Sequence, residues 1–328
     1  MKTPICMAIA ALLSVTTLIQ AQEVTAPSCH LQRLGSVELT ITPDLVLVPL
    51  TIGDQTVTMA LNTSFPRSYV TYRAAEELRL PSKPVPNTAY SGKRVPGYVT
   101  EYAVIKTFAI GDVLFANAGI AEVESLSGKD HPPVSYIGHL GMDLLRKVDF
   151  ELDLAHKKLT FFSQDHCDGK VVYWAKDFSS ARIHWDPVGT PYVPMTLDGK
   201  TIEAGLSTGG RESGIYTDAT RKLYGFDEKS ADVETVDSGT GSPVFHFRAM
   251  KLTTDGLVVT NANMRLTPAP KSGSCAFSPF GRTGHAAGYT GCAGRLPAML
   301  GRDVLDKLRL FFAMKEGVVY FTRAEAVE

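Results

Sequence analysis

An internal repeat constrains the fold of this chain more than any other feature of its sequence. Residues 48–80, VPLTIGDQTVTMALNTSFPRSYVTYRAAEELRL, align without a gap to residues 193–225, VPMTLDGKTIEAGLSTGGRESGIYTDATRKLYG, at an offset of 145. A second pair of segments, 140–145 and 300–305, reads LGMDLL and LGRDVL. Both halves carry the same parts in the same order, so the fold must contain two related units.

Within each unit the residue pattern predicts mostly strands. Short runs rich in Val, Ile, Thr and Phe alternate with polar residues and are separated by turn pairs such as Gly53-Asp54, Gly111-Asp112 and Asp198-Gly199. Two short helices are expected in each unit, at 72–80 and 142–147 in the first and at 217–224 and 302–308 in the second. The sequence therefore predicts an all-β fold with short helices.

The N-terminal segment indicates export. Lys2 is followed by an apolar run from Pro4 to Ile19 and by the small residue Ala21, which is the layout of a secretory signal peptide. An uncleaved membrane anchor is the alternative, but residues 1–22 are short for a span. We expect a periplasmic or secreted protein with no membrane contact after signal removal. The predicted segments are a signal peptide at 1–22, a first lobe at 23–165, an inter-lobe connection at 166–190 and a second lobe at 191–328.

The composition excludes several kinds of partner. The chain has 33 Lys and Arg against 34 Asp and Glu, and no long basic stripe that would neutralise a phosphate backbone. Nucleic acid is therefore not expected as a partner. No motif for a cofactor or a metal stands out, so we expect neither. The duplicated chain is expected to be a monomer with two pseudo-symmetric lobes.

Four cysteines remain once Cys6 has left with the signal peptide. Disulfides are favoured in an exported chain, and four cysteines allow three pairings. A Cys275–Cys292 bridge would close a short Gly-rich loop, worth about 3 kcal/mol in the chain-entropy model, and would leave Cys29 with Cys167. Zinc is the competing use, and His166-Cys167-Asp168 could contribute ligands, but no C-x-x-C or H-x-x-x-H spacing accompanies it.

The ordered motifs resemble a known family. Each half has a hydrophobic strand ending near a Thr, a flap-like hairpin, and then hydrophobic-Leu-Gly followed by a short helix. This resembles the pepsin/retropepsin-like aspartic proteases, and in particular bacterial exported proteins with two retropepsin-like units. The resemblance covers about residues 40–165 and 185–325. It implies a bilobal fold of two β-barrel units with one cleft between them, in which an extended peptide lies under flaps.

The sequence departs from that family at its catalytic residues. The family takes one Asp-Thr-Gly or Asp-Ser-Gly from each lobe, whereas the matching triplets here are Asn62-Thr63-Ser64 and Ser207-Thr208-Gly209. The reaction needs two carboxyl groups that share a proton, and neither an amide nor a serine hydroxyl can replace them. Both threonines are kept, and in the family they hold the two loops together. The sequence therefore predicts a pseudoprotease with no catalytic residue retained.

The predicted function is the binding of a peptide or protein segment without cleavage. The segment would add as a strand beneath flaps near Tyr98 and Phe245 and be released uncut. The residues predicted to contact it are Asn62, Thr63, Ser64, Tyr98, Ser207, Thr208, Gly209 and Phe245.

Three alternatives remain open. Asp237-Ser238-Gly239 has the sequence of a catalytic triplet, which would make the protein an active aspartic-type endopeptidase. In the repeat alignment, however, Asp237 corresponds to Gly92, where the first lobe should form its flap turn. The first lobe also offers no partner carboxylate. Ser207 with His139 as a base would be a nucleophile, although His139 is expected to be a loop residue. The protein can also be a structural or interaction module that uses residues 276–291 as its contact surface.

Overall fold

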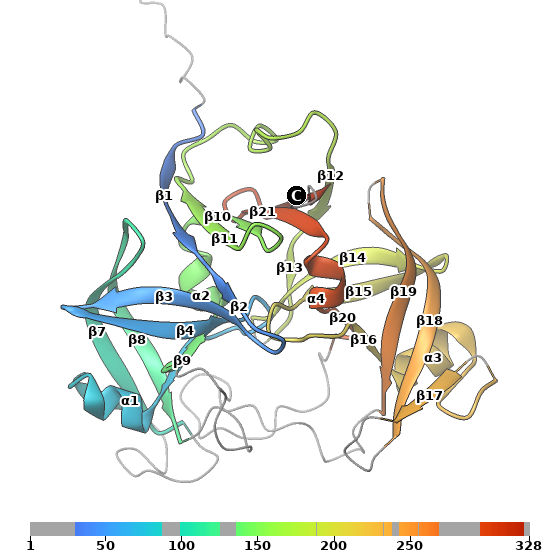
Figure 1. Ribbon diagram of the computed structural model, residues 1–328, viewed down its shortest axis with the longest axis horizontal. Coiled ribbons are helices and arrows are strands. Elements are labelled where there is room, and N and C mark those ends of the chain that lie inside the picture. The colour runs from blue at the N-terminus through green and yellow to red at the C-terminus, as the bar shows by residue number, and fades with distance from the viewer. Residues whose placement is uncertain are drawn as a thin grey trace, which may run out of the picture.

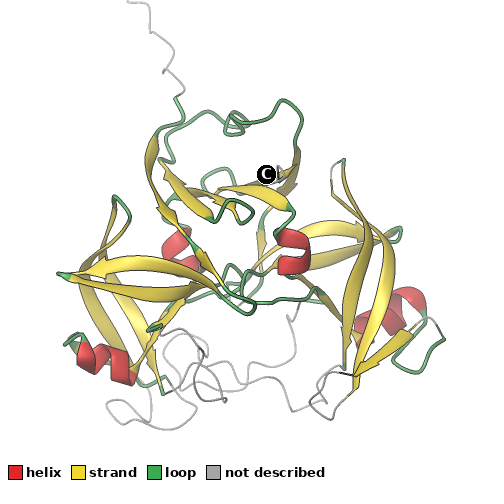
Figure 2. Cartoon of the chain, viewed as in Figure 1, coloured by secondary structure: helices red, strands yellow, loops and turns green. Residues whose placement is uncertain are grey.

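The structure is a computed structural model that describes residues 30–86, 99–124, 136–187, 189–231, 233–237, 243–254, 256–268 and 296–324. These residues form mostly β-strands with four short helices (Figure 2). The predicted all-β fold with short helices is confirmed.

The first half forms an eight-stranded sheet. In spatial order its strands are β2 (Thr40–Ile41), β3 (Val46–Ile52), β4 (Gln55–Leu61), β9 (Gly138–Leu140), β5 (Tyr69–Thr71), β8 (Val113–Val123), β7 (Glu101–Ile110) and β6 (Ser82–Pro84). An additional pairing of β3 with β7 folds the sheet onto itself. Apolar side chains that alternate along these strands fill its interior.

The second half repeats this topology. Its sheet runs in the order β13 (His184–Trp185), β14 (Pro191–Leu197), β15 (Lys200–Leu206), β20 (Ala298–Leu300), β16 (Gly214–Tyr216), β19 (Leu257–Thr267), β18 (Pro243–Thr254) and β17 (Val233–Asp237). The additional pairing of β14 with β18 matches that of β3 with β7. The duplication seen in the sequence is therefore a duplication of the whole sheet, and the two copies lie on opposite sides of the molecule (Figure 1).

The four helices lie where the sequence places them, but three end earlier. They are α1 (Tyr72–Glu77), α2 (Met142–Leu145), α3 (Thr217–Tyr224) and α4 (Arg302–Leu305). The expected extension of the last helix to residue 308 is wrong because Leu308 already pairs with Arg323 in the next strand. The third helix ends as predicted, since Gly225 adopts a positive φ of 77° that stops it.

Both halves contribute to a third, six-stranded sheet. Its order is β1 (Arg33–Glu38), β11 (Lys158–Phe162), β10 (Asp149–Asp153), β21 (Leu308–Ala313), β22 (Val318–Arg323) and β12 (Ser179–Arg182). The halves meet where β10 pairs with β21, and there the stacked rings of Phe150 and Phe312 have centroids 4.5 Å apart. This central sheet lies between the other two (Figure 1).

The segment predicted as the inter-lobe connection, 166–190, has structure of its own. It includes β12 and β13, and residues before β12 pack against the central sheet, where Val171 and Phe311 are fully buried in one cluster. Trp174 packs there and donates a hydrogen bond from Nε1 to Thr322 Oγ1 at 2.8 Å. The side chain of His166 is also buried and contacts Asp149 of β10.

Some sequence predictions fall outside the described residues. These are the signal peptide at 1–22, the cysteines at 29, 275 and 292, Tyr98 and the loop at 276–291. The disulfide pairings therefore stay predictions. In the part of the chain that the structure describes, no helix has the length and apolarity needed to cross a membrane, and no three His, Cys, Asp or Glu side chains gather as a metal site would require.

Candidate functional site

The two triplets lie at equivalent points of the two eight-stranded sheets. Asn62 follows β4, and its backbone N–H donates to the carbonyl of Leu140 at 3.0 Å. Ser207 follows β15, and its N–H donates to the carbonyl of Leu300 at 2.8 Å. In each half a parallel strand pair, β4 with β9 and β15 with β20, therefore ends at the triplet. We call the contact between the two triplets the junction.

Two buried threonines hold the junction together in a reciprocal way. Thr63 Oγ1 donates to the carbonyl of Leu206 at 2.6 Å, and Thr208 Oγ1 donates to the carbonyl of Leu61 at 2.7 Å. Each threonine hydroxyl also accepts the backbone N–H of the other threonine at 3.2 Å. The hydroxyls thus satisfy four backbone groups that burial would otherwise leave without partners.

Thr63→Val is expected to destabilise the protein by roughly 2–4 kcal/mol, because it leaves the Leu206 carbonyl and the Thr208 N–H buried without partners. Urea unfolding measures the loss. The control is Thr56→Val on the exposed part of β4, for which a change below about 0.5 kcal/mol is expected. Equal stabilities of the two variants would contradict this role for Thr63.

A second set of hydrogen bonds at the junction is one-sided. Asn62 Oδ1 accepts from the backbone N–H of Ser64 at 3.1 Å and from Ser64 Oγ at 2.8 Å. Ser64 Oγ also lies 3.0 Å from Ser207 Oγ, so it links the two halves. The second half has Gly209 at the position of Ser64 and cannot supply a matching hydroxyl. The pseudo-symmetry of the fold is therefore broken at its side chains.

The lack of a side chain at Gly209 leaves room for the amide nitrogen of Asn62. A Cβ atom built on Gly209 would lie 2.2 Å from Asn62 Nδ2, so this nitrogen packs directly against the glycine. Gly209 is exposed, whereas Asn62 is buried. The Nδ2 atom therefore lies directly against an exposed residue.

No described carboxylate forms a hydrogen bond with the side chains of either triplet. The duplicated LGMDLL and LGRDVL motifs carry Asp143 and Asp303, and each of these carboxylates is engaged elsewhere. Asp143 Oδ1 accepts from the backbone N–H and Oγ of Ser68 at 2.8 and 2.7 Å, and Asp303 accepts in the same way from Ser213. These two carboxylates stabilise the segment after each triplet, a role that their place in the repeat does not by itself predict.

Two other predicted residues lie on the β17–β18 hairpin. Asp237 ends β17, which is the outermost strand of its sheet, and Phe245 lies in β18 opposite Thr235. This hairpin is the counterpart of β6 and β7, so the backbone of Asp237 lies in a hairpin and not at the end of β15. The side chains of Asp237 and Phe245 are outside the described part of the structure.

The sequence suggested that His139 is a loop residue, and this is wrong. His139 lies in β9, where it pairs with Ala60 and Tyr69. Its ring stacks on Phe65 and Tyr69, with centroids 5.4 and 4.8 Å away, and Tyr136 contacts its edge. Nδ1 has no hydrogen-bond partner among the described residues, and burial lowers the pKa of His139 to about 4. None of its described contacts is with Ser207, so the nucleophile hypothesis gains no support.

His139 is expected to make stability depend on pH. Its pKa is lower in the folded protein than in the unfolded chain, so the unfolded chain binds the proton first. The contribution of neutral His139 to the free energy of unfolding is fully present above about pH 6.5. It falls by up to roughly 3 kcal/mol as the pH approaches 4. Urea unfolding of the wild type and of His139→Phe at several pH values isolates the contribution of His139 to the pH dependence of stability. The same pH dependence in both proteins would contradict the assignment of this effect to His139. The control is His30→Gln, at an exposed site.

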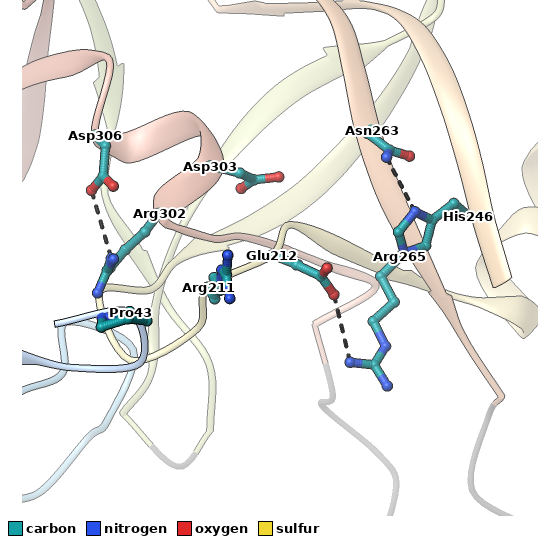
Figure 3. A pocket seen from close by; sticks show the side chains of 9 residues that line it. All are labelled: Pro43, Arg211, Glu212, His246, Asn263, Arg265, Arg302, Asp303 and Asp306. Atoms are coloured by element: carbon teal, nitrogen blue, oxygen red, sulfur yellow. Dashed lines mark hydrogen bonds and ion pairs between the residues drawn. The ribbon is translucent and has the colours of Figure 1, made fainter. Parts of the chain in front are cut away.

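A cavity of about 510 Å³ lies beside α4 in the second half (Figure 3). It is lined by Pro43, Arg211, Glu212, His246, Asn263, Arg265, Arg302, Asp303 and Asp306. Most of its charge is paired internally: Arg265 contacts Glu212 at 3.6 Å and Arg302 contacts Asp306 at 3.7 Å.

Arg302 also connects the two halves. Its Nη1 donates to the carbonyl of Thr42 in the first half at 2.7 Å. The first half has Met142 at the matching position. The replacement of Met in LGMDLL by Arg in LGRDVL is the one sequence signal for this contact. The repeat alone does not show which group Arg302 contacts. The paired charges favour a structural role for the cavity, so the junction remains the candidate site.

Comparison with known proteins adds no assignment: no family model matches the sequence, and no curated protein matches it.

Proposed function

We propose that this protein is a catalytically silent relative of the aspartic proteases that binds an extended peptide or protein segment between its two halves. The observation that supports the proposal most is the junction, where Thr63 and Thr208 keep the loops joined while Asn62 and Ser207 stand where a catalytic pair would need carboxylates. In this proposal the scaffold of such an enzyme is retained without its chemistry.

The duplicated hairpins support a peptide as the ligand. β6 and β7 in the first half correspond to β17 and β18 in the second, and both pairs are antiparallel. Strand β6 and strand β17 are outer strands of their sheets, and an outer strand offers backbone groups to an added strand. In this proposal an exported protein holds its segment by backbone hydrogen bonds and releases it uncut.

Retention of a mixed hexapeptide library on the immobilised protein tests the proposal. Two neighbouring glycines supply the matched variants. Gly209→Ala would push its Cβ into Asn62 Nδ2 and should weaken retention about tenfold, which corresponds to about 1.4 kcal/mol of binding free energy. Gly210→Ala should change retention little, because its Cβ would lie 3.6 Å from Ser207 Oγ, an ordinary contact distance.

A failure of binding and a misplaced site give different results. No retained peptide on a wild-type protein whose fold is verified by circular dichroism would overturn the proposed function. Equal loss of retention in the two alanine variants would place the binding site away from the junction.

A further inference from the structure

The orientation of the Asn62 amide is fixed by the backbone. Its oxygen accepts the N–H of Ser64 at 3.1 Å, and a backbone N–H can only donate, so the atom it contacts must be Oδ1. The opposite end of the amide is then Nδ2, which carries two N–H groups. Nδ2 lies against exposed Gly209, and no hydrogen bond from it is found among the described residues.

The neighbouring hydroxyls do not use these two protons. Ser64 Oγ lies 2.8 Å from Asn62 Oδ1 and 3.0 Å from Ser207 Oγ. Ser64 Oγ is the donor in both contacts, so its one hydroxyl proton goes to Asn62 Oδ1 or to Ser207 Oγ. Neither of these bonds uses a proton of Nδ2, so both of its protons are left for a ligand.

We infer that the junction recognises an oxygen acceptor of the ligand, namely a carbonyl of the peptide main chain, and selects against a cationic group at that point. The inference rests on the proposed function. Asn62 and Ser207 bear no negative charge to offset an ammonium group, and Nδ2–H would face it with a like partial charge. A pair of carboxylates has the reverse preference, because it attracts a protonated amine.

Two matched hexapeptide libraries separate these preferences. One keeps the central peptide bond, and the other replaces it with –CH₂–NH–, which removes the carbonyl and supplies a protonated amine at neutral pH. Wild-type protein is expected to retain the intact library about tenfold better, as the loss of one hydrogen bond to the ligand implies. Retained peptides are quantified by mass spectrometry, and the best matched pairs are then measured by calorimetry.

Asn62→Asp is the discriminating variant. The side chain keeps its shape, and its carboxylate can still accept from the Ser64 N–H and Oγ, so the fold should be preserved. The atom that replaces Nδ2 becomes an acceptor, and the preference should shift by at least about tenfold toward the reduced library. The control Thr56→Val should keep the wild-type preference.

The outcomes distinguish this inference from the proposed function. Retention of neither library by the wild type overturns the proposed function. Retention of both libraries without a preference, or with a preference for the reduced one, leaves peptide binding intact and overturns the donor role of Asn62. An unchanged preference in a folded Asn62→Asp protein overturns it as well.

Discussion

The double variant Asn62→Asp/Ser207→Asp is expected to hydrolyse unfolded casein at acid pH, and the wild-type protein is expected not to. Two carboxyl groups at the junction would share one proton, so that one activates water while the other protonates the substrate carbonyl. Positioned acid–base groups contribute roughly 10²–10⁴-fold each. We therefore expect a gain of at least about 10²-fold over the wild type, with the highest rate below about pH 5.

The geometry of the junction favours this gain. The Ser64 N–H and Oγ would hydrogen-bond to the carboxylate introduced at residue 62 as they do to Asn62 Oδ1. Ser64 Oγ lies 3.0 Å from Ser207 Oγ and can also reach a carboxylate at residue 207. The threonine contacts between the loops are unaffected, because the two hydroxyls bond only to backbone carbonyls and N–H groups.

The two single variants are the matched controls. Each has one carboxyl group and no partner to share a proton with, so neither should cleave casein above the wild-type level. Cleavage by the wild type that disappears in Asp237→Ala would contradict the proposed silence and favour the endopeptidase alternative. A folded double variant without activity would show that the junction does not correspond to a protease centre.

Arg309→Ala is expected to destabilise the protein by about 3–5 kcal/mol, the range for breaking a buried ion pair. Arg309 belongs to β21 and contacts Glu151 of β10 at 2.8 Å and Asp153 at 3.6 Å, and both carboxylates are buried. Its guanidinium also lies 4.3 Å from the ring centre of Trp174. Removing it leaves the buried Glu151 carboxylate of the first half without its cation.

Urea unfolding of Arg309→Ala and of a surface control measures this effect. Arg73→Ala breaks an exposed ion pair with Glu77 on α1, and a much smaller loss of stability is expected there because solvent screens the pair. In the double variant Arg309→Met/Glu151→Leu much of the stability should return, because an apolar pair carries no desolvation cost. Similar losses in Arg309→Ala and Arg73→Ala would show that the buried contact does not join the halves.

The duplicated parts of the fold are predictable from the sequence because their periodicity is local. The strands around residues 48–61 and 193–206 follow from alternation and turn residues in both copies. Helices α1 and α3 each begin directly after a repeated strand. The Thr71 side chain caps the first of them by accepting the N–H of Ala74, and Gly225 ends the second, so these boundaries are also set by residues close in the sequence.

The central sheet could not be predicted in the same way. Its outer strands, β1 and β12, read RLGSVE and SSAR, so the repeat is not visible there. Strand β12 lies inside the segment that looked like a connection, because short polar strands carry little alternation. It is defined by its pairing with β22.

At the candidate site the sequence located both triplets, and the resemblance implied the contact that the two threonines make between the loops. It did not predict the one-sided link from Ser64 to Ser207 or the aromatic surroundings of His139. Both depend on which side chains from distant strands meet, and spacing along one chain does not encode that. The positions of Tyr98 and the side chain of Phe245 stay predictions.

The shared central sheet also has a consequence for how the chain can be divided. Each half supplies three adjacent strands, and β10 and β21 border each other where the two sets meet. In a fragment ending before β12, β10 would be an edge strand with unpaired backbone groups. In the remaining fragment β21 would be such an edge strand too. Two such fragments made separately would each expose the strand edge that pairs with the other. The chain is therefore suited to a split-protein sensor, in which two fragments associate to restore the fold.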